Sequence, residues 1–340
     1  MKRIGIIGAA GYAGAELVRI LAAHPRAAIA CLTCHQDAGR PFDAIYPGMT
    51  SWIDQVCETY ELDIMLKAGV ELVFTALPHK LPMSIVPELL DNGIKVVDLS
   101  ADFRFKQASV YAASYQPHSC ADLLKKAVYG LSEVYTEQVR DAVLVGNPGC
   151  YPTSILMPLI PLLKAGLIEP AGIIADAKSG VSGAGRSATA ATHYCHVNES
   201  FKPYKVGNHR HAPEMEAILT EQAGMPVPLV FVPHLVPMTR GMQSTIYALP
   251  RENVTETDIG DCLADFYKAR EFVRLRGQQP PDTLHVKGTN CIDISWKLDP
   301  RQGRLVLMTA IDNLTCRVDA DTDGDGLYDV VIETIGWDEL

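Results

Sequence analysis

The residue best suited to chemistry is Cys150, in the run Gly146-Asn147-Pro148-Gly149-Cys150-Tyr151-Pro152-Thr153. An apolar strand is expected just before it, over 142–145, and a helix just after it, starting near Pro152, a favoured first-turn residue. The partial positive charge at a helix start favours thiolate over thiol, so a cysteine at this place suits a nucleophile. A buried structural cysteine is the alternative.

Two further clusters carry groups that act on acyl or anionic ligands. Residues 179–186 read Ser-Gly-Val-Ser-Gly-Ala-Gly-Arg, and the backbone N–H groups and guanidinium of such a loop could hold a phosphate or carboxylate. A surface turn is the alternative. The second cluster is His209-Arg210-His211-Ala212-Pro213-Glu214. A histidine beside an acyl-transfer cysteine can act as general base and acid, because its pKa lies near neutrality.

A third cluster follows the first expected strand, residues 2–7. It is Gly8-Ala9-Ala10-Gly11-Tyr12-Ala13-Gly14, and a helix with Leu17, Ile20 and Leu21 on one face comes next. A strand, a glycine loop and a helix in this order are typical of a site for a dinucleotide pyrophosphate. The spacing is G-x-x-G-x-x-G rather than G-x-G-x-x-G. A tight turn without a ligand is the alternative.

The end of the second expected strand, residues 27–33, bears on which dinucleotide binds. NAD-binding domains often place a carboxylate there for the ribose 2′-hydroxyl. Here the strand ends in Thr33-Cys34-His35-Gln36, and Asp37 comes late with Arg40 close behind it. A hydroxyl, an imidazole and a guanidinium suit a 2′-phosphate, so the sequence favours NADP over NAD.

The remaining pattern predicts two domains. Strands over 72–77 and 95–99 flank a helix over 83–90, and such alternation is typical of a parallel sheet with helices on both faces. After Cys150 the strands look antiparallel. We therefore expect an α/β fold, with a Rossmann-type doubly wound parallel sheet over 1–147 and an α+β catalytic domain with a mostly antiparallel sheet over 148–312, residues 313–340 returning to the first domain. The later strands are expected over 173–177, 229–236, 244–249, 291–298 and 304–311.

Composition excludes several classes of function. The chain has 340 residues, of which 48% are hydrophobic and 21% charged, as in an ordinary globular protein. Its net charge of −10 argues against nucleic acid as the main partner. No signal peptide and no apolar run of about 18 residues is present, so neither secretion nor a membrane span is expected. Nine cysteines, an odd number, favour reduced thiols in the cytoplasm.

Two short segments contain the residue types that bind metals. They are Cys31-Leu32-Thr33-Cys34 and His193-Tyr194-Cys195-His196. Neither has a second group of ligands at a suitable spacing. No metal site is therefore predicted.

Five segments together resemble the N-acetyl-gamma-glutamyl-phosphate reductase family. They are 8–14, Leu99-Ser100-Ala101-Asp102-Phe103-Arg104, 146–153, 179–186 and 209–214. The resemblance spans about residues 1 to 314, in order and with family-like spacing. The segment 146–153 separates this family from aspartate-semialdehyde dehydrogenase and glyceraldehyde-phosphate dehydrogenase, which share the two-domain plan and the cysteine.

The resemblance implies a reaction. Cys150 attacks the acyl phosphate of N-acetylglutamyl 5-phosphate, expels phosphate and forms a thioester, which NADPH reduces to the 5-semialdehyde in the third step of arginine biosynthesis. A thiolate suits both halves because it is a good nucleophile and a good leaving group. His209 best matches the family's catalytic histidine, and His211 is the rival assignment. The resemblance also implies a homo-oligomer, either a dimer or a tetramer.

The same resemblance, together with the glycine loop and the end of the second strand described above, gives the expected binding residues. Arg104, Ser179 and Arg186 are expected to hold the anionic groups of the substrate, with His211 and Glu214 beside them. The residues expected to bind NADP(H) are Gly8, Ala10, Gly11, Tyr12, Ala13, Gly14, Thr33, His35, Arg40, Pro78, Asn147, Pro148 and Asn313.

The chain departs from the family after Leu314. The family continues with a helix beside the cofactor, whereas residues 315–329 contain five aspartates near alternate positions. This pattern resembles a D-x-D-x-D-G calcium loop, although the closing glutamate is out of register. A solvated acidic tail or a local change of reading frame are the alternatives. Without the helix we expect weaker cofactor binding.

Two other functions stay open. One is the same chemistry on the aminoadipyl carrier of lysine biosynthesis. The other is a non-catalytic NADP-binding sensor, which the altered tail alone supports.

Overall fold

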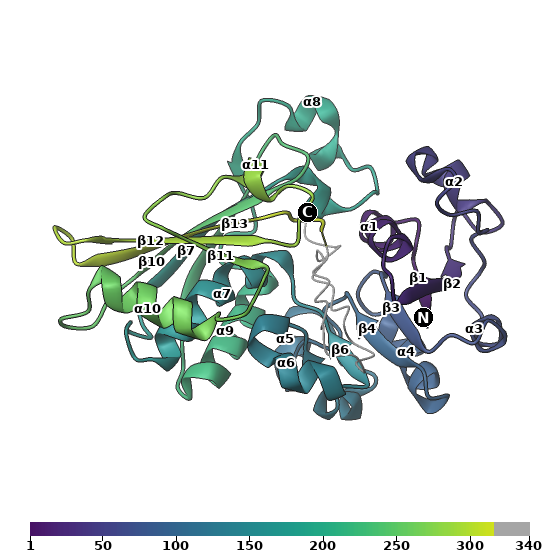
Figure 1. Cartoon of the computed structure of the whole chain (residues 1–340), viewed down its shortest axis with the longest axis horizontal. Coiled ribbons are helices and arrows are strands. Elements are labelled where there is room, and N and C mark those ends of the chain that lie inside the picture. The colour runs from purple at the N-terminus through teal and green to yellow at the C-terminus, as the bar shows by residue number, and fades with distance from the viewer. Residues whose placement is uncertain (316–340) are drawn as a thin grey trace. The chain divides into compact units, whose positions relative to one another are not determined.

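The computed structural model describes residues 1–315 of the chain, in two units, Met1–Pro148 and Gly149–Thr315 (Figure 1). The segment predicted to return to the first domain starts at Asn313, but residues 313–315 belong to the second unit. The rest of that segment, with the acidic stretch that resembles a calcium loop, lies outside the described residues.

The first unit is built on one six-stranded sheet in which every pairing is parallel. Its strand order is β2-β1-β3-β4-β6-β5, so the chain reverses direction across the sheet between β1 and β3. Ligands of doubly wound sheets bind at the carboxyl ends of the strands at such a switch point. The predicted doubly wound parallel sheet is confirmed. The strands are β1 (Lys2–Ile7), β2 (Ala27–Thr33), β3 (Leu72–Thr75), β4 (Lys95–Asp98), β5 (Val128–Tyr129) and β6 (Leu144–Gly146).

The central strands of this sheet are covered on both faces. All four residues of β3 are buried, as is expected where helices pack on each side of a parallel sheet. The helices and 3-10 turns are α1 (Tyr12–Ala22), α2 (Phe42–Ile45), η1 (Pro47–Met49), α3 (Leu62–Lys67), α4 (Pro82–Asp91), α5 (Ala108–Ser114), η2 (Ala121–Lys125) and α6 (Ser132–Asp141).

The second unit is built on a seven-stranded mixed sheet in the order β11-β12-β13-β10-β7-β9-β8. Only β7·β9 and β11·β12 pair in parallel, so the predicted mostly antiparallel sheet is confirmed. The short edge strands β8 and β11 are not among the predicted ones. The strands are β7 (Ile173–Ser179), β8 (Lys202–Pro203), β9 (Leu229–Leu235), β10 (Met242–Ala248), β11 (Val273–Gly277), β12 (Ile292–Asp299) and β13 (Arg304–Ile311).

One face of this sheet carries the long helices α7, α9 and α10 (Figure 1). Residues alternate between the two faces, so β7 buries Ile173, Ala175 and Ala177 against the helices. The opposite face exposes apolar side chains, among them Val230 at 57%. The helices and 3-10 turns are α7 (Cys150–Lys164), η3 (Val181–Ala184), η4 (Ala190–Thr192), α8 (Tyr194–Val197), α9 (His211–Ala223), α10 (Glu256–Phe266) and α11 (Thr283–Val286).

Helix α7 is buried from Cys150 to Leu163 although it contains Pro158 and Pro161. A proline inside a helix has no N–H for the carbonyl four residues earlier. Side chains from elsewhere supply the missing donors: the Thr309 hydroxyl bonds to the Ser154 carbonyl at 2.9 Å, and the Tyr267 hydroxyl bonds to the Met157 carbonyl at 2.6 Å. Both carbonyls are thus satisfied, and the helix stays intact at the centre of the unit.

Candidate active site

Cys150 is the first residue of α7, and only 7% of it is exposed. Gly149 caps the helix in an extended conformation, and the Thr153 N–H closes the first turn on the Gly149 carbonyl at 3.0 Å. The helix therefore begins two residues before the expected start at Pro152. This brings the sulfur to the end of the helix where the backbone favours a thiolate.

The imidazole of His211 packs against Gly149, the residue before Cys150. A Cβ atom on Gly149 would lie 2.3 Å from His211 Nε2, so only glycine leaves room for the ring. The Gly149 N–H donates to Glu214 Oε1 at 3.0 Å. Both side chains come from the start of α9 and are 1% exposed. The first turn of α9 thus places an acid–base group and a carboxylate beside the nucleophile.

His209 contacts the start of α9 and a group of aromatic rings. Its Nδ1 accepts the His211 N–H at 3.2 Å, and the two imidazole centroids are 5.0 Å apart. Aromatic rings surround it, with Tyr151 at 5.5 Å and Phe231 at 5.1 Å, both edge-on. His209 therefore packs as a support for the start of α9, whereas the contact with Gly149 belongs to His211.

The loop 179–186 uses its first three backbone donors within the fold. The N–H groups of Gly180, Val181 and Ser182 donate to the carbonyls of Gly241, Met238 and Thr239 at 2.9, 2.9 and 3.1 Å. These three donors are used within the fold, and the predicted anion site of the loop as a whole stays a prediction.

The two side chains predicted to act in this loop differ in exposure. Ser179 ends β7 and is 4% exposed, and its hydroxyl donates to the Gly180 carbonyl at 3.0 Å. Arg186 is exposed. Arg186 is therefore the side chain of this loop that a solvent-borne anion can reach.

The first unit holds the predicted pyrophosphate loop at the carboxyl end of β1. The N–H groups of Gly8 and Ala9 both donate to the Thr33 carbonyl, at 2.9 and 3.0 Å. A Cβ on Gly8 would lie 2.2 Å from the Ala76 carbonyl oxygen, and one on Gly14 would lie 2.3 Å from the Gly8 carbonyl oxygen. Ala10 accepts the Tyr46 hydroxyl at 2.8 Å, which anchors the loop from outside.

The start of α1 is suited to an anion. The helix begins at Tyr12 after the cap Gly11, with no acidic residue in its first turn. The first N–H groups of a helix, here those of Tyr12, Ala13 and Gly14, have no acceptor within the helix. The loop therefore fits a dinucleotide pyrophosphate, which would meet these donors.

The groups expected near a ribose 2′-phosphate lie after β2. Thr33 is 1% exposed, whereas His35 and Arg40 are exposed. Arg40 pairs with Asp37 at 2.5 Å and donates to the Ala44 carbonyl at 3.3 Å. The late carboxylate thus neutralises and positions the arginine, and His35 and Arg40 are the groups that a 2′-phosphate could reach.

Arg104 is buried, at 2% exposure, and acts within the first unit on the backbone. Its Nε donates to the Asn147 carbonyl at 2.6 Å and its Nη2 to the Leu99 carbonyl at 2.8 Å. The Asn147 N–H in turn donates to the Asp98 carbonyl at 2.8 Å. Arg104 therefore fixes the residues that precede Pro148, and its predicted contact with substrate stays a prediction.

Two buried carboxylates beside Arg104 were given no role by the sequence. Asp98 accepts the hydroxyls of Thr75 and Ser100, both at 2.6 Å. Burial and the nearby charge of Asp102 raise the pKa of Asp98 to about 7. The motif 99–104 carried the family resemblance, but its spacing gives no sign that Asp98 joins it.

Asp102 holds the loop that contains Pro78. It accepts the Lys80 N–H at 2.8 Å and the Tyr111 hydroxyl at 2.8 Å. Lys80 has a φ of 82°, a conformation that a lysine rarely adopts and that this contact supports. Burial raises the pKa of Asp102.

Other candidate chemistry does not come together in the described residues. Within 1–315 there is no group of three or more histidine, cysteine or acidic side chains placed to hold a metal ion, and no disulfide joins the eight cysteines there. Burial raises the pKa of Cys31 to about 11. No helix in this part of the chain is long and apolar enough to cross a membrane.

Comparison with known proteins gives consistent matches. The family model of the semialdehyde dehydrogenase NAD binding domain matches residues 3–142, and that of the semialdehyde dehydrogenase dimerisation domain matches residues 150–313. An N-acetyl-gamma-glutamyl-phosphate reductase of Desulforapulum autotrophicum is 52% identical over 92% of this chain and 91% of its own. The enzyme of that name from Syntrophobacter fumaroxidans is 50% identical over 93% and 91%.

Solved structures share the fold. Aspartate semialdehyde dehydrogenase II from Vibrio cholerae matches with a TM-score of 0.69 at 15% identity, covering 92% of this chain and 94% of its own. Aspartate semialdehyde dehydrogenase with NADP from Candida albicans matches with a TM-score of 0.66 at 16% identity, over the same shares. At such identities the likeness concerns the fold.

Proposed function

Because the chain belongs to the N-acetyl-gamma-glutamyl-phosphate reductase family, we propose that it reduces N-acetyl-L-glutamyl 5-phosphate with NADPH to N-acetyl-L-glutamate 5-semialdehyde and phosphate. The reaction is a step of arginine biosynthesis. The observation that carries the proposal is Cys150 as the first residue of α7, in a chain 52% identical to a reductase of this name over nine-tenths of its length.

Cys150 is the nucleophile of the proposed reaction. Its thiolate attacks the acyl carbon, the C–O bond to phosphate breaks, and phosphate leaves with the electron pair, so that the acyl group is held as a thioester. NADPH, when bound, supplies the hydride that reduces this thioester. Hydride addition leaves an oxyanion on the former acyl carbon. This oxygen takes a proton from the neighbouring acid–base group and gives it back as the C–S bond breaks, which releases the aldehyde and returns the thiolate.

His211 is proposed as the group that moves this proton. Its ring lies against Gly149, one residue from the sulfur, which favours His211 over the first-ranked His209. Glu214 accepts the Gly149 N–H and so fixes the turn that presents Cys150. His209 supports the same turn through the His211 N–H. The cofactor site is proposed at the start of α1 and at His35 and Arg40.

The open face of the second sheet is proposed as the contact between two copies of the chain. The match to a dimerisation domain over residues 150–313 supports this role. So do three exposed apolar residues on that face: Ile174, Val230 and Tyr247, which are 38, 57 and 37% exposed. A homo-oligomer in the cytoplasm, with its thiols reduced, is the form we propose. Sedimentation of wild type and of Val230→Glu tests it, and a wild-type monomer would contradict it.

The test of the reaction runs in reverse. The purified protein is given N-acetylglutamate 5-semialdehyde, phosphate and NADP⁺, and NADPH absorbance is followed, with aspartate semialdehyde as comparison substrate. We expect phosphate-dependent turnover of the acetylglutamate compound alone, and none in Cys150→Ala, which still binds NADPH. Turnover in that variant would exclude the thioester route, and preference for the aspartate compound would exclude the substrate.

A further inference from the structure

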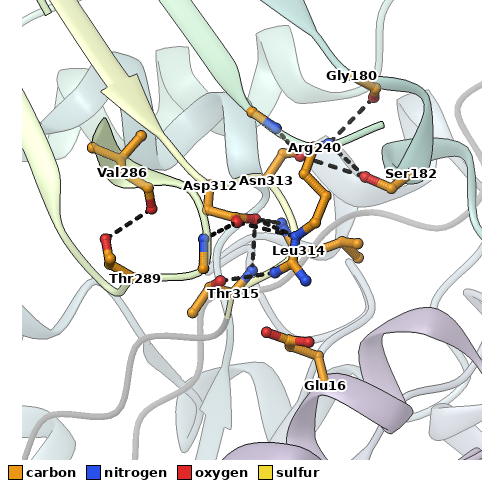
Figure 2. A network of polar contacts seen from close by, with 12 residues as sticks. Glu16, Gly180, Ser182, Arg240, Val286, Thr289, Asp312, Asn313, Leu314 and Thr315 are labelled. Atoms are coloured by element: carbon orange, nitrogen blue, oxygen red, sulfur yellow. Dashed lines mark hydrogen bonds and ion pairs between the residues drawn. The ribbon is translucent and has the colours of Figure 1, made fainter. Parts of the chain in front are cut away.

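Asn313, two residues after β13 in the second unit, is 1% exposed, and both the oxygen and the nitrogen of its amide form hydrogen bonds. Its Oδ1 accepts the Gly241 N–H at 2.7 Å, and its Nδ2 donates to the Gly180 carbonyl at 3.2 Å. Figure 2 shows the side chain between Gly180, Ser182 and Arg240. One amide thus joins the chain end of β13 to the loop after β7 and to the residue that precedes β10.

Two hydroxyls complete the surroundings of this amide. Ser182 Oγ lies 3.2 Å from Nδ2 and 3.4 Å from Oδ1, and Ser179 Oγ lies 3.3 Å from Nδ2. A primary amide has two N–H donors and two acceptor lone pairs. Both the N–H donors and the acceptor oxygen of the Asn313 amide therefore have partners within the fold, in the loop 179–186 and at Gly241.

The amide ties the start of the loop to a distant segment, which the local bonds of the loop, such as the Gly185 N–H to the Ser182 carbonyl at 3.1 Å, do not do. The first three backbone donors of the loop reach carbonyls at 238–241, about sixty residues away in the sequence. Gly180 is confined there, since a Cβ would lie 2.9 Å from the carbonyl oxygens of Met238 and Thr239. Asn313 is the side chain that bonds to both edges of the contact, Gly180 on one side and Gly241 on the other.

We infer that Asn313 is a positioning residue for the substrate loop 179–186, and not the cofactor contact that the sequence predicts. The inference rests on the proposed function: the acyl phosphate carries anionic groups, and we place them at Arg186, the exposed guanidinium of this loop. Asn313 acts by holding the loop at the place where Arg186 can meet them.

Asn313→Asp is the sharpest test, because it keeps the shape and the acceptor but sets a carboxylate oxygen against the Gly180 carbonyl. Asn253→Asp, at an exposed site, makes the same charge change as a matched control. We expect KM for phosphate and for the semialdehyde to rise about tenfold in Asn313→Asp, the value of one lost buried hydrogen bond. The Kd for NADPH, measured by fluorescence, should equal that of the control.

Ser182→Ala removes a single partner of the amide and guards against misfolding of the first variant. It should raise the same KM by a smaller factor, without altering NADPH binding. A weaker Kd for NADPH with KM unchanged would assign Asn313 to the cofactor and overturn the inference, as would no change in either constant.

Amide hydrogen exchange separates this inference from the reaction itself. In Asn313→Asp the N–H groups of Gly180, Val181 and Ser182 should exchange faster than in Asn253→Asp, whether or not the protein turns over substrate. Inactive wild-type protein with this acceleration would refute the proposed function and keep the positioning role. Unchanged exchange would refute the positioning role alone.

Discussion

The two glycine-rich loops, 8–14 and 179–186, look alike in the sequence but are built in different ways. The first is shaped by the backbone next to it: Gly8 fits against the Ala76 carbonyl and Gly14 against the Gly8 carbonyl, with Cβ positions at 2.2 and 2.3 Å. The second is shaped by Asn313, a side chain more than 130 residues away. A glycine cluster in a sequence therefore predicts a tight turn. It does not predict which contacts hold the turn or which ligand the turn binds.

The two loops also differ in what they leave for a ligand. The first opens the eleven-residue helix α1, whose initial N–H groups have no acceptor in the helix. The second leads into η3, a single short turn, and its first three N–H groups, at 180–182, bond to carbonyls at 238–241. The first loop can hold an anion with the N–H groups at the start of its helix, whereas the first donors of the second are already used and its exposed cation is Arg186.

Gly14→Ala should have the largest effect. The added methyl meets backbone atoms of Gly8 and Ala9, which cannot rotate away as a side chain can. We expect NADPH to bind at least about a hundredfold more weakly, because a shift of the loop removes the helix start from the pyrophosphate. Gly48→Ala in the same unit, where nothing lies within 4 Å, is the control. Equal NADPH titrations for the two variants would contradict the backbone account of this loop.

The first unit also contains a buried group whose charge depends on pH, Asp98 at the end of β4, and Asp98→Asn tests its effect on stability. The pKa of buried Asp98 rises from 3.8 to about 7, first through burial and then through Asp102, whereas a neutral amide holds the loop 179–186. A raised pKa means that the folded protein keeps a proton that the unfolded chain loses. The contribution of Asp98 to stability is therefore complete below about pH 4 and is lost as the pH rises to about 7.

Thermal unfolding measures that loss. Between pH 4 and 7 the midpoint of wild type should fall relative to that of Asp98→Asn by several degrees, in the direction that linkage requires. Asn313→Asp should not change this pH dependence of the first unit. Parallel midpoints for wild type and Asp98→Asn would show that Asp98 is ionised in the folded protein.

Gly180→Ala should have a smaller effect than Gly14→Ala, and it should weaken binding of the acyl substrate instead of NADPH. Its Cβ would stand 2.9 Å from two carbonyl oxygens, a milder conflict than 2.3 Å. We expect KM for the acyl substrate to rise about tenfold, with the Kd for NADPH unchanged. Steady-state kinetics and NADPH titration on one preparation would distinguish this from general unfolding, and a change in NADPH affinity would remove the contrast between the loops.

The sequence is most informative where structure is local. The bounds of β1 and β2 agree with the predicted strands, because each is a short apolar run ended by turn residues. Cys150 likewise lies at a helix start, which the neighbouring residues predict. The edge strands β8 and β11 escape prediction because their pairing with β9 and β12 is settled by distant residues.

The candidate site is less readable for the same reason. Arg104 reaches Asn147 over 43 residues, and Asn313 reaches Gly180 over 133. Residue type suggests that a guanidinium or an amide binds a ligand, but only the fold shows which backbone groups they already hold. Asp98 was missed because burial, which raises its pKa, leaves no mark in a short motif.

Tyr267→Phe should have the smallest effect and touches neither loop. It removes the donor to the Met157 carbonyl, which Pro161 leaves without an N–H in α7. An unmet buried carbonyl costs about 1 kcal/mol or somewhat more, so urea unfolding should show that loss, whereas Tyr247→Phe on the open sheet face should show none. Both KM values and the Kd for NADPH should stay at wild-type levels, because the two loops are held by other contacts. A raised KM in Tyr267→Phe would mean that a change inside α7 alters the substrate loop 179–186. The contacts of Asn313 would then not be enough to hold that loop in place.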